Sequence, residues 1–276
     1  MDILYSQPGI RPRKTRITVV IPSSVLDTEA TGLQRALKAS RIARIAAMFR
    51  VNEIIVYKWE RNKQSFKELC DLLEYAVRPP YLKKYIPLRK TLRHAGVMEP
   101  LNIWIHKVSK NAEKHPIRLA QVLEIWAEEA LIDAGLQKPL TLKLDAGSRV
   151  SKGDIVLVKI NPATWEAELY DERRFYTGYT VNCARKPVEL FTQTKKHFRL
   201  GLTRHGKPLS NGLIKKIRVI GNISLYLGGP HYDIFQVYRG VGFHETVNVH
   251  ENQGTETLRT EEALCVGLSR LSPIVD

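Results

Sequence analysis

The first 77 residues alternate between short apolar runs and helical patterns, and this alternation limits the fold more than any other feature of the chain. Residues 17–22 (ITVVIP) and 51–57 (VNEIIVY) have the length and β-branched content of buried strands. A helical pattern follows each run; the first opens on the capping box TGLQ at 31–34 and runs to about residue 49, and the second covers 65–77. Strand–helix–strand–helix order with short connections predicts an α/β fold with a parallel sheet and right-handed crossovers.

The first helix carries both apolar and basic side chains at helical spacing. We expect its buried side to be formed by Leu33, Leu37, Ile45 and Met48. Its basic residues recur every three positions, at Arg35, Lys38, Arg41 and Arg44. At 100° per residue such a row drifts round the helix, so it predicts a solvated face at least as well as an RNA contact.

Residues 103–183 have a different sequence pattern, in which short segments of alternating apolar and polar residues are separated by many turns. Strands are expected over 121–126, 130–135, 139–144, 154–160 and 179–184. Short strands at this spacing predict a small β-barrel of the kind that includes the OB-fold, which often binds oligonucleotides. We therefore expect 103–183 to be an inserted RNA-binding barrel, and 1–102 with 184–276 to form one discontinuous α/β domain.

After the insert, the α/β pattern returns and ends in glycine-containing turns. A strand over 198–203 leads into RHGK, a polar connection covers 210–216, and a strand beginning at 217 leads into Gly228-Gly229-Pro230. A last strand at 246–249 precedes NQGT at 252–255, and a helix from Thr260 should end at Ser272-Pro273. In open α/β sheets ligands bind at the carboxyl ends of strands, so these turns predict a small-molecule site.

The net charge of +15 favours a polyanionic partner, and nucleic acid is the first expectation, although solubility alone is an alternative. The basic excess is concentrated in residues 1–100, whereas 241–276 is acidic. Segment 78–93 interleaves basic residues with Tyr81 and Tyr85, which suit phosphates and unpaired bases, unless the tyrosines pack inward. The residues expected to contact RNA are Arg13, Lys14, Arg78, Lys83, Lys84, Arg89 and Lys90.

Several other classes of protein are disfavoured. No apolar run approaches the ~20 residues of a membrane helix, and the start of the chain lacks the pattern of a signal peptide. Three widely spaced cysteines, Cys70, Cys183 and Cys265, make a disulfide framework or a zinc ribbon improbable and favour a reducing, cytoplasmic setting. His244 and His250 lack metalloprotease spacing, and neither a P-loop nor a nicotinamide fingerprint occurs. No metal is expected.

Four blocks of sequence together resemble a known family. They are residues 33–57, 80–100, 130–150 with YTGYTV at 176–181, and the C-terminal set LTRHG (202–206), LYLGGPH (225–231) and NQGTETLRTEEA (252–263). The chain resembles the SPOUT superfamily of S-adenosylmethionine-dependent methyltransferases, in its archaeal and eukaryotic RNA methyltransferase branch with an inserted OB-like domain. The resemblance implies a trefoil-knotted sheet and a homodimer with the C-terminal helix at its interface. Core packing explains the apolar stripe of that helix (Ala263, Leu264, Leu268, Leu271) equally well.

The resemblance also implies which residues bind the cofactor, S-adenosylmethionine. They are Thr203, Leu227, Gly228, Gly229, Pro230, Asn248, Asn252, Gln253, Gly254, Thr255, Thr257, Leu258 and Thr260. Arg204 is the candidate catalytic residue: it stays protonated, so it would hold a phosphate or a developing oxyanion, although a surface ion pair is the alternative. His205 could act as a base or be an ordinary loop residue.

The expected function is therefore methyl transfer to a base nitrogen or ribose oxygen of RNA, with ribosomal RNA as the implied substrate. The alternative is a non-catalytic RNA-binding or ribosome-assembly protein built on the same scaffold.

Overall fold

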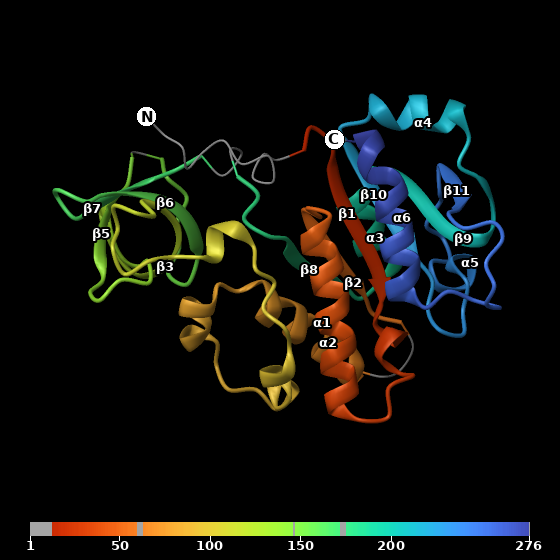
Figure 1. The fold of residues 1–276 in the computed structure, drawn as a ribbon, viewed down its shortest axis with the longest axis horizontal. Coiled ribbons are helices and arrows are strands. Elements are labelled where there is room, and N and C mark those ends of the chain that lie inside the picture. The colour runs from red at the N-terminus through yellow and green to blue at the C-terminus, as the bar shows by residue number, and fades with distance from the viewer. Residues whose placement is uncertain (1–12, 60–62, 146, 172–174, 276) are drawn as a thin grey trace. The chain divides into compact units, whose positions relative to one another are not determined.

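A computed structural model describes residues 13–59, 63–145, 147–171 and 175–275 (Figure 1). The chain divides into two compact units. One, here called the sheet unit, comprises residues 13–77, 88–101 and those from 178 onward; the other, the barrel unit, comprises 78–87 and 102–177. The expected RNA contacts at 78–93 therefore fall partly in one unit and partly in the other.

The sheet unit is built on a six-stranded parallel sheet in the order β11-β9-β10-β1-β2-β8. Its central strands are fully buried: Val19 and Val20 of β1 and Ile54 and Ile55 of β2 have no exposed surface. Burial on both faces is why these strands read as continuous apolar runs. The strand bounds are β1 (Arg16–Pro22), β2 (Glu53–Tyr57), β8 (Thr180–Ala184), β9 (Phe198–Pro208), β10 (Asn222–Leu227) and β11 (Glu245–Asn248). The predicted parallel α/β sheet is confirmed.

Helices flank this sheet and the connections between its strands. Their bounds are η2 (Ser23–Leu26), α1 (Gly32–Met48), α2 (Lys63–Val77), α3 (Pro187–Thr194), α4 (Asn211–Arg218), α5 (Ile234–Val237) and α6 (Thr260–Val275). Short 3-10 turns occupy η3 (Pro80–Tyr85), η4 (Lys90–Leu92), η5 (Ala95–Val97) and η6 (Trp104–His106). The capping box of α1 is present: the Thr31 hydroxyl accepts from the Gln34 amide (3.2 Å), and the Gln34 side chain accepts from the Thr31 amide (3.0 Å).

Two predictions about helices were wrong. Residues 210–216, predicted as a polar connection, belong mostly to α4, whose first turn is capped by the Ser210 hydroxyl accepting from the Leu213 amide (3.2 Å). Helix α6 continues past Pro273 to Val275. A proline in the last turn removes one intrahelical hydrogen bond close to the helix end, where few turns remain to be lost.

The prediction for the buried side of α1 was also wrong. Leu33 is 44% exposed and Met48 is 60% exposed, whereas the buried positions are mostly small residues. Helix α1 packs against both α2 and α6, and alanines allow helices to approach closely. The buried residues of α1 are Ala36, Lys38, Ala39, Ser40, Ile42, Ala43 and Ala46.

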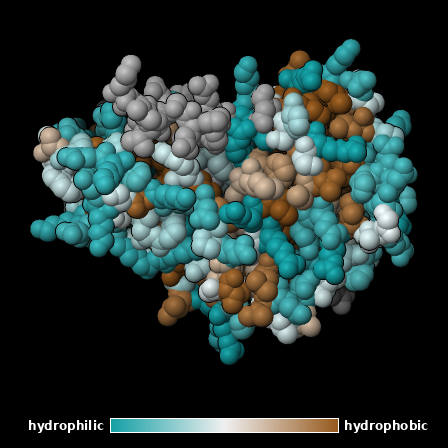
Figure 2. Space-filling view, viewed as in Figure 1, coloured by the Kyte–Doolittle hydropathy of each residue, from teal (hydrophilic) through white to brown (hydrophobic). Residues whose placement is uncertain are grey.

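The face of the molecule seen in Figure 2 is mostly hydrophilic, with hydrophobic residues gathered in patches.

The barrel unit contains a closed five-stranded barrel in the order β3-β4-β5-β7-β6. Strands β5 and β7 pair in parallel, and the other pairs are antiparallel. Its core is formed by inward-facing residues such as Val122, Ile132, Leu142 and Val158. The strand bounds are β3 (Ile117–Trp126), β4 (Glu129–Asp133), β5 (Leu140–Lys143), β6 (Ile155–Asn161) and β7 (Glu166–Leu169). The predicted β-barrel is confirmed.

The fifth strand of the barrel was assigned wrongly from the sequence. Residues 180–184 form β8, which pairs in parallel with β2 in the sheet unit, and the barrel is completed by β7 instead. Strand β8 lies at the edge of its sheet, so its exposure alternates as a barrel strand's would. Strand β7 (EAEL) is short and acidic, and its sequence carries little strand signal.

The cysteines depart from expectation as well. Cys70 of α2 and Cys183 of β8 form a disulfide, and Cys265 is free. Helix α2 packs against β8, which brings together two cysteines that are far apart in the sequence. Within the described residues, no helix has both the length and the apolarity needed to cross a membrane. The same residues contain no cluster of three or more histidine, cysteine or acidic side chains suited to a metal.

Candidate active site

A cavity of about 330 Å³ lies in the sheet unit, beside the middle of β9 and the loop that follows β10. Most of the residues predicted to bind the cofactor line it, and so does Arg204. Those brought together are Thr203, Leu227, Gly228, Gly229, Pro230, Asn248, Gln253, Thr257, Leu258 and Thr260. Asn252, Gly254 and Thr255 do not line the cavity; they belong to the same loop, where Gln253 donates to the Thr255 carbonyl oxygen (2.9 Å).

A bulge in β9 turns the segment LTRHG toward this cavity. Strand β11 pairs with β9 at Thr246↔Gly201 and then at Val247↔Lys207, so residues 202–206 are extra on the β9 side. The Asn248 side chain holds the bulge by donating to the Arg204 carbonyl oxygen (3.1 Å). At Gly206 a Cβ atom would lie 2.5 Å from the backbone of Val247, so only glycine fits this close approach.

The floor of the cavity contains a hydrogen-bonded pair, Thr203 and Asp233. The Thr203 hydroxyl donates to Asp233 Oδ2 (2.6 Å) and accepts from the His205 amide (3.2 Å). Asp233 also caps α5, accepting through Oδ1 from the Phe235 amide (3.2 Å). Asp233 and Gln236 were not predicted from the sequence, although their D-x-x-Q spacing is that of a second capping box and could have identified the turn.

The loop after β10 forms one wall of the cavity and is held through its backbone carbonyl oxygens. The Gly228 carbonyl oxygen accepts from the Thr260 hydroxyl (3.1 Å), which ties this loop to the first turn of α6. The preceding residue, Leu227, is held through its carbonyl oxygen by the buried Tyr238 hydroxyl (2.8 Å). A Cβ atom at Gly229 would lie 2.7 Å from Ser24 Oγ, so this glycine also permits a close approach.

Arg204 and His205 contact each other at the rim. Arg204 Nε donates to His205 Nε2 (3.2 Å), and its terminal nitrogen donates to the Glu256 carbonyl oxygen (3.1 Å). Among the described residues no carboxylate pairs with Arg204, so its positive charge faces the cavity without an acidic partner. His205 Nε2 is engaged as an acceptor, and it could take a proton from a ligand only after Arg204 turned away.

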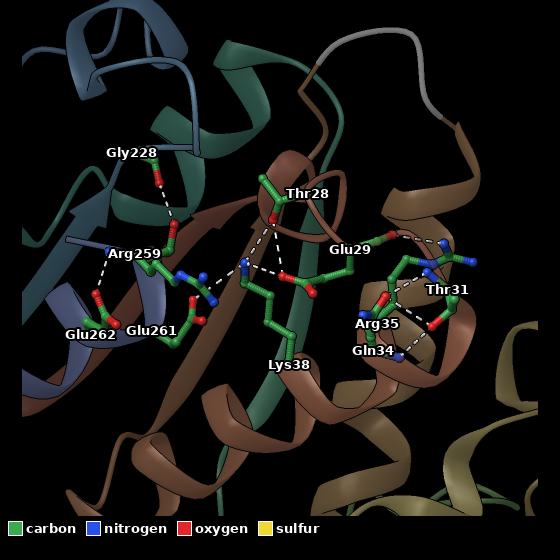
Figure 3. Close-up of polar contacts among 11 residues, drawn as sticks. Thr28, Glu29, Thr31, Gln34, Arg35, Lys38, Gly228, Arg259, Glu261 and Glu262 are labelled. Atoms are coloured by element: carbon green, nitrogen blue, oxygen red, sulfur yellow. Dashed lines mark hydrogen bonds and ion pairs between the residues drawn. The ribbon is translucent and has the colours of Figure 1, made fainter. Parts of the chain in front are cut away.

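Behind the first turn of α6 lies a buried ionic cluster that sequence reasoning missed (Figure 3). Lys38 Nζ donates to Thr28 Oγ1 and to Glu29 Oε1, both at 3.0 Å, and lies 3.7 Å from Glu261 Oε2. Burial alone would raise the pKa of Glu29, but the hydrogen bond and charge of Lys38 outweigh burial and hold that pKa below 4.5. For the basic row of α1 the sequence left a solvated face or an RNA contact open; Lys38 fits neither, because it is buried and faces Glu261 of α6.

The segment 78–93 is largely engaged in contacts within its own unit. In the barrel unit, Arg78 donates to Gln121 (3.0 Å), Lys84 pairs with Asp133 (2.6 Å), and burial lowers the pKa of Lys83. The tyrosines also point inward: Tyr81 donates to the Leu119 carbonyl oxygen (2.8 Å) and Tyr85 to Asp133 (2.6 Å).

The remaining expected RNA contacts belong to the sheet unit. Arg89 pairs with Asp71, and Arg13 donates to the Ser272 hydroxyl. Lys14 and Lys90 are exposed. The stripe of α6 that was expected to serve either an interface or the core is mostly core, because Leu264, Leu268 and Leu271 are buried in the single chain.

The chain thus combines a parallel α/β sheet, with a glycine-containing cavity beside β9 and β10, and a separate β-barrel. A family model described as "Putative RNA methyltransferase" matches residues 16–271, and the chain belongs to that family.

Curated relatives extend along nearly the whole chain. A 28S rRNA (uridine-N(3))-methyltransferase of Drosophila melanogaster is 26% identical over 95% of this chain and 62% of its own length. The Homo sapiens protein of the same description is 25% identical over 95% of this chain and 79% of its own. An uncharacterized protein of Haloarcula marismortui is 26% identical over 92% of this chain and 98% of its own.

Proposed function

We propose that this protein transfers a methyl group from S-adenosylmethionine to N3 of a uridine in ribosomal RNA. The observation that carries the proposal is the cavity between the β9 bulge, the loop after β10 and the segment 248–260, into which Arg204 brings a positive charge that no carboxylate of the described residues pairs. Family membership supports methyl transfer to RNA, and the descriptions of the insect and human relatives supply the uridine N3 target.

The residues present suit the cofactor. A cavity of about 330 Å³ is within the range of small-molecule sites, and the close approaches at Gly206 and Gly229 leave backbone groups accessible. The loop after β10, the β9 bulge and the segment 248–260 would hold the cofactor, which supplies an activated methyl carbon when bound. No metal is needed for such a transfer.

The protein's own task is to orient the uridine and manage its N3 proton. Arg204 would lie against a carbonyl oxygen of the base and stabilise the negative charge that develops as N3 loses its proton. Once Arg204 makes that contact, His205 Nε2 is released from it and becomes able to accept the proton. Thr203 and Asp233 fix the backbone beneath both residues.

The finer fold assignment also belongs to this proposal. We assign the sheet unit to the SPOUT superfamily with its trefoil knot, and the barrel to an OB-like RNA-binding domain inserted between α2 and β8. The strand order and the single parallel pair β5–β7 support the barrel assignment. A homodimer in the cytoplasm completes the proposal; the exposed Leu33 and Met48 of α1 are apolar groups that a second subunit could cover.

Isotope-labelled methyl transfer tests this function directly. The purified protein is incubated with methyl-labelled S-adenosylmethionine and ribosomal RNA from cells that lack the gene, and the RNA is mapped by mass spectrometry. Label on N3 of one uridine is expected. Tight cofactor binding without label in any RNA would instead favour a non-catalytic ribosome-assembly role, and failure to bind the cofactor by calorimetry would reject the proposal.

A further inference from the structure

The basic charge of this protein is not carried by the barrel. Residues 102–177 contain eleven lysines and arginines and eleven aspartates and glutamates, so they have no net charge. Residues 78–87 add three basic residues, and 1–12 are neutral, which leaves twelve of the fifteen net positive charges in the sheet unit. The electrostatic attraction for a polyanion therefore originates mainly in the sheet unit.

A group of six cations lies at the edge of the sheet where the strands begin, here called the amino edge. It includes Arg16 at the start of β1, Lys195 and Lys196 just before β9, and Lys215, Lys216 and Arg218 in the last turns of α4. Figure 1 shows α4 at the end of the sheet where β1 begins. All six side chains are exposed.

Contacts join these elements into one surface. Lys216 Nζ lies 4.9 Å from the ring centroid of Phe198, the first residue of β9. The Arg16 amide donates to the Gly221 carbonyl oxygen (2.9 Å), which brings the start of β1 to the turn after α4. Burial lowers the pKa of His197, which follows Lys196; the charge of Glu53 raises this pKa, and the charges of Arg16 and Arg199 lower it, so these residues lie near one another.

This surface is poorly neutralised. Among the described residues, the only ion pair made by the six cations is Lys216 with Glu245, at 3.6 Å, and both side chains are about half exposed. Such a surface pair contributes little. Burial lowers the pKa of nearby His244, the charges of Arg199 and Lys216 lower it further, and the charge of Glu245 raises it in part. The segment 78–93, by contrast, has most of its cations engaged.

Aromatic rings are interleaved with the cations. The Arg199 guanidinium lies 5.2 Å from the ring centroid of Phe191, which is 44% exposed. The exposed His244 ring stacks on Phe198, with centroids 5.1 Å apart and planes 23° apart. Cations that can reach phosphates, beside rings on which a base can stack, are the features of single-strand and loop recognition in RNA.

The amino edge is remote from the cavity. Strand β10 runs from the edge at Asn222 to the cavity wall at Leu227, and six extended residues span about 20 Å. One nucleotide cannot occupy both places. We propose that the amino edge is a second RNA-binding surface, which holds the phosphate backbone of a folded or long RNA while the target nucleotide occupies the cavity. The placement of the target nucleotide in the cavity rests on the proposed function, whereas RNA binding at the edge does not.

Charge removal tests the surface. The variant K195Q/K196Q/K215Q/R218Q loses four edge charges, and the control R41Q/K67Q/K186Q/R239Q loses four exposed charges of the sheet unit that are not part of the amino edge. Binding is measured without cofactor, by fluorescence anisotropy at several salt concentrations, on a folded ribosomal RNA fragment and on oligouridine of about ten nucleotides. Unchanged melting temperatures verify folding, and calorimetry with S-adenosylhomocysteine verifies the cavity.

We expect the edge variant to bind the folded RNA tenfold or more weakly than the native protein. The slope of log affinity against log salt concentration should become shallower by about three, because each lost phosphate contact removes ~0.7–0.9. The control variant should lose less than threefold for either RNA, and the edge variant should also bind oligouridine more weakly, because the edge has the features of single-strand recognition. Equal losses in both variants would show that only net charge matters. No loss in the edge variant would overturn the proposal and point to an acidic protein as the partner of this edge.

The two proposals can fail separately. If the edge variant loses folded-RNA affinity but the native protein never methylates RNA, the edge stands and the methyltransferase assignment fails. If the native protein methylates and the edge variant methylates folded RNA with unchanged KM, the edge fails and the enzyme assignment stands.

Discussion

Lys38 of α1 and Glu261 in the first turn of α6 are both buried, at 5% and 7% side-chain exposure, with Nζ and Oε2 3.7 Å apart. Glu29 approaches Lys38 from the other side at 3.0 Å. Thr260, next to Glu261, donates to the Gly228 carbonyl oxygen in the cavity wall. The ion pair therefore connects the helix that follows β1 to the loop that follows β10.

Removing Lys38 should destabilise the protein strongly. In Lys38→Met, Glu29 and Glu261 lose their cation, and breaking a buried pair costs about 3–5 kcal/mol. Urea denaturation at pH 7.5 measures the free energy of unfolding. Lys67→Met, at an exposed position of α2, is the control and should change it by less than about 0.5 kcal/mol. Equal stability of the two variants would show that the cluster is solvated.

Arg204→Ala should reduce methyl transfer by 100-fold or more, in line with the ~10²–10³ cost of removing one charge-stabilising donor. Within the described residues, its exposed side chain bonds only to His205 and a carbonyl oxygen, so the melting temperature should remain within about 1 °C of the native value. Single-turnover assays at saturating cofactor measure the effect. Arg239→Ala, at an exposed position outside the cavity lining, is the control. A large fall in melting temperature would remove the catalytic assignment.

Gly206 and Gly254 give a matched pair of alanine substitutions. A Cβ at Gly206 meets the backbone of Val247 and Asn248 at 2.5–2.7 Å, whereas one at Gly254 meets nothing within 4 Å. Gly206→Ala must push β11 away from the bulge and should weaken S-adenosylhomocysteine binding tenfold or more by calorimetry. Gly254→Ala should bind within twofold of the native protein. Similar affinities for both variants would mean that the bulge adapts freely.

Stability should depend on pH through His106 of the barrel unit. Burial lowers its pKa from 6.5 to about 4, despite the hydrogen bond to the Thr177 carbonyl oxygen. Below pH 6.5 the unfolded state binds a proton on His106 that the folded state does not. The free energy of unfolding therefore falls as the pH is lowered from 6.5 to 4, and His106 has no effect on it above pH 6.5. The full effect is about 3 kcal/mol. Urea titrations of His106→Gln should show a weaker fall over this window, while exposed His250→Gln should follow the native curve.

Patterns with one physical cause were readable from the sequence. Strands β1 and β2 are buried on both faces, and the box at Thr31 needs only local contacts, so both were predicted correctly. Features that depend on a neighbouring helix or strand could not be predicted from the sequence. The exposure of Met48, the burial of Lys38 and the membership of β8 in the sheet all depend on which element packs alongside, and periodicity does not contain that information. At the candidate site, glycine turns identified the loops, while Asp233 emerged only with α5 in place.

The pairing of β1 with both β2 and β10 has a consequence for synthesis on the ribosome. Val20 pairs with Ile55, which emerges early, and with Tyr226, which emerges only after the whole barrel has been made. Until then the nascent chain presents β1 with one open edge, and open parallel edges with apolar side chains are sites of misassociation. The barrel contains all its own strand partners and can fold during this interval. Strand β1 therefore gains its second partner only after β10 has been synthesised, whereas the barrel does not wait for it.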